Sequence, residues 1–292
     1  MAQFNFPILT GKQLYEKLKE KWLILDLPEA DVIHFFDHHS YFQLVMYFQY
    51  YWKANEKWEK IFREGIAISK ILDDYNFDHE LRILLFSQII HIENSFKNIL
   101  CQTTCQTMGN LWWTDAVHFR DTRAYNESIK PLLDAMDMQD YSKSEFIEKY
   151  FDKYDDPKYP PFWNMLEVFT FGQIVKMYKS LNDNTIRNSI WDFYELNDAK
   201  LANWIKIIVD IRNMCCHHSK MLDKNFKIAK VSKIESMVDE KNETLYHWCT
   251  LIYYFLKIIK PENDFKSKVI DLIQKYHIVS HGFPQNIDTL WN

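Results

Sequence analysis

Helical periodicity is the sequence feature that most constrains the fold of this chain. From Asp78 to Gln102, apolar residues recur every three or four positions, and charged residues occupy the other side. This spacing gives an α-helix one apolar face. The pattern returns from Asp198 to His218, where Asp198 is expected to cap the helix. Further helices are expected at 11–25, 40–73, 122–137, 142–154, 162–181, 184–195, 245–259 and 265–273.

These patterns predict an all-α fold, an irregular helical bundle. The 292 residues include only 5 Gly and 8 Pro, too few for the many turns of a β-sandwich. Phe226–Val231 is the one candidate for a short extended segment. Three prolines within Asp155–Pro161 forbid a continuous helix there. We therefore expect one domain over residues 1–292, with 155–161 as the candidate boundary between two lobes.

The location of the protein is predicted from three further features. No run reaches the ~18 apolar residues that a membrane-spanning helix needs. The N-terminus lacks a charged segment followed by an apolar core, so no secretory signal is expected. The five cysteines are then expected to be reduced thiols. Together these features predict a cytoplasmic protein with no membrane partner.

Charge is distributed unevenly along the chain. The net charge is −5, which argues against a protein that binds nucleic acid over its whole surface. Residues 200–233, here called the basic stripe, carry eight cations against two carboxylates, a net charge of +6. The candidates for contact with an RNA backbone are Lys206, Lys220, Lys224, Lys227 and Lys230. The alternative is a solvated lysine face with no partner.

A candidate catalytic group lies within the basic stripe. On one helix, Arg212, Asn213 and His217 would share an arc of about 140°. An imidazole can carry protons near neutral pH, and a guanidinium can grip phosphate oxygens in a bidentate way. These groups suit RNA cleavage by the adjacent 2′-hydroxyl without a metal. His218 would point elsewhere unless the helix has ended.

Structural readings of the same residues remain open. Arg and His at this spacing also occur by chance, and Arg187-Asn188 repeats the dipeptide without a matching His. Zinc is disfavoured at Cys215-Cys216-His217-His218, because four consecutive helical residues cannot converge on one tetrahedral ion. Cys101 and Cys105 are expected to be buried and apolar. No metal or cofactor is therefore expected.

Several stretches resemble known families. Arg212-Asn213-x-x-x-His217 has the form of the R-x4–6-H motif of HEPN-type ribonucleases. Ile211–Lys220 resembles the "LRNxCxHHxR" segment of the Abi-like (AbiD/AbiF) proteins of bacterial abortive infection. Gln43, Lys97 and residues 220–223 depart from the family pattern. The stretches that agree are Tyr41–Tyr47, Phe77–Arg82, Ile92–Lys97, Phe162-Trp163, Phe171–Gln173 with Tyr178, Gly282–Pro284 and Leu290-Trp291.

The resemblance implies a HEPN-like helical domain and a metal-independent endoribonuclease toxin acting in phage defence. It also implies that Arg212, Asn213 and His217 are catalytic. Some members of the family are paired with a small noncoding RNA as antitoxin. Glu93 becomes a candidate for positioning these groups, and its alternative is an ion pair with Lys97, four residues away on the same helix.

Two further questions stay open at this point. One imidazole cannot easily be both base and acid on opposite sides of a phosphorus, so a homodimer that brings two copies of His217 together is expected. The alternative is a monomer in which His218 is the second proton carrier, which requires the helix to end at His217. A different function class is a non-catalytic RNA-binding or scaffold protein that uses the basic stripe.

Overall fold

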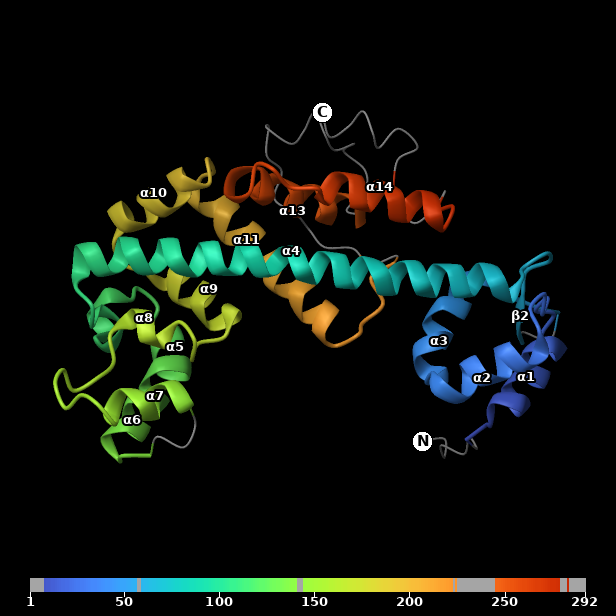
Figure 1. The fold of residues 1–292 in the computed structure, drawn as a ribbon, viewed down its shortest axis with the longest axis horizontal. Helices are drawn as coiled ribbons and strands as arrows, with labels where there is room; N and C mark the ends of the chain where they lie inside the picture. The colour runs from blue at the N-terminus through green and yellow to red at the C-terminus, as the bar shows by residue number, and fades with distance from the viewer. Residues whose placement is uncertain are drawn as a thin grey trace.

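The computed structural model describes residues 8–56, 59–140, 144–222, 224, 245–278 and 283. Its central element is the helix α4 (Ile68–Met108), whose 41 residues span about 60 Å. Figure 1 shows the other helices gathered along and at both ends of α4. The contacts of α4 with α3, α8, α9, α10, α11, α13 and α14 make it the axis of the fold.

A first group of short elements lies at the N-terminal end of α4 (Figure 1). Its two strands form an antiparallel hairpin in which Trp52 is opposite Phe62. The turn is closed by Asn55, whose side-chain oxygen accepts a hydrogen bond from the amide of Glu59 at 2.8 Å. The elements of this group are α1 (Gly11–Glu20), α2 (Glu29–His38), α3 (Tyr41–Phe48), η1 (Gln49–Tyr51), β1 (Trp52–Ala54) and β2 (Lys60–Phe62).

A second group lies at the C-terminal end of α4 (Figure 1). The connection 155–161 joins α7 to α8 inside this group. Its carbonyl at Pro160 accepts a hydrogen bond from the indole of Trp113 at 3.1 Å, which fixes it against the segment that follows α4. The elements are η2 (Trp112–Thr114), η3 (Ala116–His118), α5 (Thr122–Ala124), the π-helical η4 (Tyr125–Ile129), α6 (Lys130–Asp137), α7 (Glu145–Phe151) and α8 (Phe162–Met165).

The remaining helices pack along the middle of α4. The rings of Trp204 on α11 and Phe255 on α13 meet edge to face at 6.2 Å, and Phe96 of α4 contacts Tyr178 of α9 in the same way. Buried apolar residues from all three parts of the fold belong to one continuous cluster. The helices are α9 (Phe171–Ser180), α10 (Asn184–Phe193), α11 (Asp198–Cys216), α13 (Leu245–Ile259) and α14 (Phe265–Lys275).

The all-α prediction is confirmed, with corrections to individual elements. The helix expected at 40–73 is correct only at its two ends, in α3 and in the first turns of α4, because β1 and β2 interrupt it. The helix expected at 162–181 is two helices, since Thr170 opens α9 with a capping box. Asn197, not Asp198, caps α11, with its side chain accepting from the amide of Lys200. The helix α2 was not expected from the sequence, and Phe226–Val231 lies outside the described residues.

No helix in the described part of the chain combines the length and apolar character needed to cross a membrane.

Candidate functional site

The C-terminal end of α11 carries the candidate catalytic group. His217 is the C-cap residue, and its amide donates to the carbonyl of Asn213 at 2.9 Å. The amide of Ser219 bonds back to Met214 at 3.0 Å, and that of His218 to Cys215 at 3.4 Å. This pair of bonds is a Schellman motif. The last helical residue is therefore Cys216 and His217 is the cap, so the helix ends two residues earlier than the sequence predicts.

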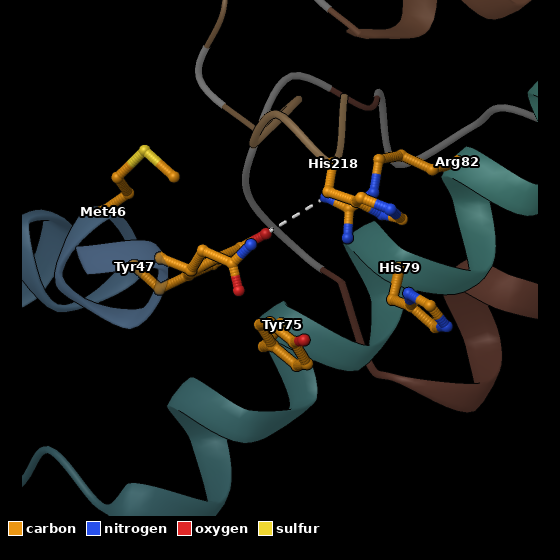
Figure 2. A pocket seen from close by; sticks show the side chains of 7 residues that line it. Met46, Tyr47, Tyr75, His79, Arg82 and His218 are labelled. Carbon is orange, nitrogen blue, oxygen red and sulfur yellow. Dashed lines mark hydrogen bonds between the residues drawn. The ribbon is translucent and has the colours of Figure 1, made fainter. Parts of the chain in front are cut away.

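His218 occupies the position where a Schellman motif favours glycine. Its φ of 53° lies in the left-handed region, where a β-carbon is strained. The turn sends the chain away from the helix axis, and His218 lines a pocket between α3 and α4 (Figure 2). His218 can be a second proton carrier only if the helix ends at His217. Because His217 is the C-cap of α11, this condition is met.

Arg212 is held from one side by α4. Its Nε lies 3.9 Å from Oε2 of Glu93, too far for a hydrogen bond but close enough for charge attraction. Its Nη1 is 3.4 Å from the side-chain oxygen of Asn213. The Arg212 side chain is 36% exposed and that of Glu93 14%. Glu93 thus faces the inner edge of the guanidinium, and the outer edge remains accessible to an anion.

Glu93 also makes the contact expected under its alternative role. Its Oε1 lies 2.9 Å from Nζ of Lys97, one turn further along α4. One carboxylate therefore meets two cations, with the shorter contact to Lys97. Both predicted roles of Glu93 are compatible with this geometry.

The second Arg-Asn dipeptide provides an internal comparison. Arg187 on α10 is buried and forms an ion pair with Asp198 at the start of α11. Asp198 also accepts a hydrogen bond from the hydroxyl of Tyr178 at 3.0 Å. Arg187 therefore joins helices, whereas Arg212 presents part of its side chain to solvent beside the exposed side chains of Asn213 and His217.

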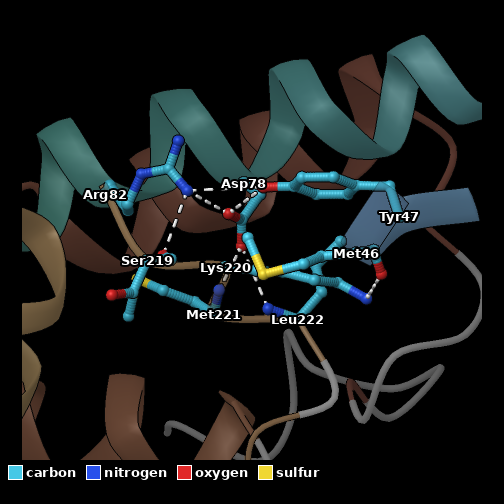
Figure 3. A network of polar contacts seen from close by, with 8 residues as sticks. All are labelled: Met46, Tyr47, Asp78, Arg82, Ser219, Lys220, Met221 and Leu222. Carbon is cyan, nitrogen blue, oxygen red and sulfur yellow. Dashed lines mark hydrogen bonds and ion pairs between the residues drawn. The ribbon is translucent and has the colours of Figure 1, made fainter. Parts of the chain in front are cut away.

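A buried carboxylate on α4 fixes the segment that follows His218 (Figure 3). Asp78 is fully buried and accepts hydrogen bonds from the amides of Met221 and Leu222, each at 3.0 Å. It also accepts from the hydroxyl of Tyr47 at 2.6 Å and pairs with Arg82 one turn away. These four donors make Asp78 the hub that attaches the end of α11 to α4.

Arg82 completes this attachment. Its Nη1 donates to the carbonyl of Ser219 at 3.2 Å as well as to Asp78. Burial is the largest influence and disfavours the charge of Arg82, but Asp78, Tyr47 and Tyr75 together outweigh it and raise the pKa of the guanidinium. Asp78 and Arg82 were not identified as site residues from the sequence, although both lie in the stretch Phe77–Arg82 that resembles the Abi-like pattern.

The lysines of the basic stripe have different surroundings. Lys206 is exposed and pairs with Asp210 at 2.8 Å, and Lys224 is exposed. Lys220 is buried: its Nζ donates to the carbonyl of Met46 at 3.1 Å and lies 5.2 Å from the ring centroid of Tyr47. The RNA contact expected of Lys220 does not fit this burial. Lys227 and Lys230 lie outside the described residues.

The cysteines are free thiols, and most of them lie in the core. Burial raises the pKa of the thiols of Cys215 and Cys101 to about 12. The sulfurs of Cys101 and Cys105 lie 3.9 Å apart, and Cys216 is exposed. Within the described residues, no group of three or more His, Cys, Asp or Glu side chains could hold a metal ion.

The chain matches a known protein family. A family model described as Abi-like protein covers residues 34–223, well over half of the chain. The matched region includes α3, the whole of α4 and the end of α11, and so contains the hub and the candidate catalytic group. No curated protein and no solved structure matches significantly.

Proposed function

Because the chain belongs to the Abi-like protein family, we propose that it is a cytoplasmic endoribonuclease toxin of bacterial abortive infection, with a HEPN-type active site. The family suggests a role in phage defence. The observation that carries the enzymatic part is the partly exposed Arg212 beside the exposed Asn213 and His217, at an end of α11 that Asp78 and Arg82 attach to α4.

The proposed reaction uses the RNA's own 2′-hydroxyl. An imidazole takes its proton while the oxygen attacks the adjacent phosphorus. The guanidinium of Arg212 stabilises the charge that develops on the phosphate oxygens, and Asn213 orients Arg212 or donates to the same oxygens. The bond to the 5′-oxygen then breaks and that oxygen takes a proton from an acid. The products are a 2′,3′-cyclic phosphate and a 5′-hydroxyl.

The nature of the products tests this proposal. Purified protein should cleave single-stranded RNA equally well with and without EDTA, because the mechanism needs no metal. The upstream fragment should carry a 2′,3′-cyclic phosphate, read by mass spectrometry. Intact RNA that is nevertheless bound would favour the non-catalytic RNA-binding function, and EDTA-sensitive cleavage with a 3′-hydroxyl product would overturn the mechanism.

The proposed active unit is a homodimer. The mechanism needs a base and an acid on opposite sides of the phosphorus, and each chain supplies one His217. Ile83 and Ile90 on α4 are 58% and 42% exposed, and their seven-residue spacing puts them on nearly the same side of the helix. An apolar pair of this kind suits the centre of an isologous interface.

Introducing positive charge at this apolar pair should separate the dimer. The double substitution Ile83→Lys and Ile90→Lys is expected to give monomers by light scattering and to lower RNA cleavage at least tenfold. Val117→Lys, at an equally exposed position away from α4, is the matched control and should change neither. A wild-type protein that is monomeric at assay concentration and fully active would contradict the homodimer.

The proposed contacts between the protein and the RNA backbone rest on positive charge. Lys206 and Lys224 are the exposed candidates for contact with the RNA backbone, and Lys227 and Lys230 continue the same series in sequence. A small noncoding RNA is the antitoxin proposed from the family resemblance.

A further inference from the structure

A pocket lies at the chain that leaves the candidate catalytic group, where His218 follows His217, and has no part in the mechanism above. It has a volume of about 270 Å³ and lies between α3, α4 and the chain that leaves α11 (Figure 2). This is slightly below the ~300–1,000 Å³ of typical small-molecule sites, so it suits a ligand the size of one nucleotide. Its lining residues are Gln43, Met46, Tyr47, Tyr75, His79, Arg82 and His218.

The polar lining suits an anion. Arg82 is only 5% exposed, and its Nη1 is engaged by Asp78, Tyr47 and Ser219. Its Nε and Nη2 donors have no hydrogen-bond partner in the part of the chain that the structure describes. His79 and His218 add two imidazoles from separate elements, and no carboxylate lines the pocket among the described residues.

The apolar lining suits a flat ring or a sugar. Tyr75 is half-buried and meets the ring of Tyr47 edge to face at 5.4 Å. One face of Tyr47 is covered by Lys220, and the ring of Tyr75 also contacts those of Phe35 and His39. Met46 and the part of Tyr75 that lines the pocket are the surfaces available to a ligand. Aromatic side chains provide sequence-tolerant surfaces on which nucleic-acid bases stack.

The backbone of His218 determines where its ring points. Its left-handed φ is shared by four other described non-glycine residues, so the φ does not by itself mark a ligand site. The turn directs the imidazole into the pocket, and consecutive Cα atoms are only ~3.8 Å apart, so the pocket begins one residue from His217. An RNA chain with its reacting phosphate at His217 would bring a neighbouring nucleotide to this opening.

We propose that this pocket is a binding subsite for the nucleotide next to the cleaved phosphate. Arg82, His79 and His218 face its phosphate, and Tyr75 packs against its base or ribose. The inference rests on the proposed RNA cleavage and adds the position of a flanking nucleotide. It makes His218 a substrate-binding residue.

Binding measured without cleavage tests this subsite. In a His217→Ala background, affinity for a fluorescent single-stranded RNA is measured by anisotropy. Adding His218→Gly or His79→Ala should weaken RNA binding about tenfold. His218→Gly should leave the free energy of unfolding unchanged or slightly higher, because glycine tolerates the left-handed φ. His91→Ala, an exposed histidine elsewhere on α4, is the matched control and should bind RNA normally.

Two results would overturn the subsite. One is unchanged RNA affinity in both pocket variants. The other is tight binding of a free nucleoside monophosphate that is lost in His218→Gly while RNA affinity is retained, which would mark the pocket as a site for a free nucleotide. Failure of the proposed function is distinguishable, because it would appear as intact RNA with the wild-type protein or as persistent cleavage by His217→Ala, and not as a change in binding.

Discussion

His217→Ala is expected to lower the rate of RNA cleavage by about 10²–10⁴-fold, the usual contribution of a positioned general acid or base. The fold should survive, because the cap at the end of α11 uses the backbone amide of His217 and not its ring. The exposed ring fills no core volume. Single-turnover cleavage and circular dichroism, measured on the same preparation, separate loss of chemistry from loss of structure.

Two neighbouring variants sharpen this test. Arg212→Lys should also be strongly impaired, since an ammonium cannot reproduce the bidentate fork that the accessible edge of the guanidinium offers. Cys216→Ala changes an exposed side chain between Asn213 and His217 and should cleave RNA at the wild-type rate. Full cleavage and full cellular toxicity of His217→Ala would refute the proposed active site.

Most of the fold could be predicted, because each amphipathic helix buries one apolar face that shows in the spacing of its apolar residues. α13 and α14 match the expected apolar spacing to within two residues. The hairpin from Trp52 to Phe62 could not be predicted, because a short aromatic-rich run fits a buried helix face as well as a strand. Asn55 favours a turn, but its bond to the amide of Glu59 becomes visible only in the structure.

The candidate site could be predicted only in part. The helical spacing of Arg212, Asn213 and His217 follows from sequence, since all three lie on or directly after α11. The direction of His218 depends on where α11 ends, and a non-glycine residue in the left-handed region gives no sequence signal for that end. The hub at Asp78 joins residues more than 140 positions apart, a pairing that local periodicity does not contain.

Asp78→Ala is expected to reduce the free energy of unfolding by about 3–5 kcal/mol, the usual cost of breaking a buried ion pair from one side. The substitution leaves the guanidinium of Arg82 buried without its carboxylate. It also leaves the amides of Met221 and Leu222 without an acceptor. Urea-induced unfolding measures the loss, and RNA cleavage should fall with it because the end of α11 is no longer attached to α4.

Glu80, a carboxylate two residues further along α4, is the matched control for Asp78. Glu80 on α4 pairs with Lys275 at 2.7 Å, and both side chains are partly exposed, so Glu80→Ala should cost less than about 1 kcal/mol. Removing both buried partners, with Asp78→Leu and Arg82→Met, should cost less than the sum of the two single changes, because no unpaired charge is left inside. If Asp78→Ala unfolds at the same urea concentration as Glu80→Ala, Asp78 does not hold the end of α11. The proposed position of His217 would then lack its anchor.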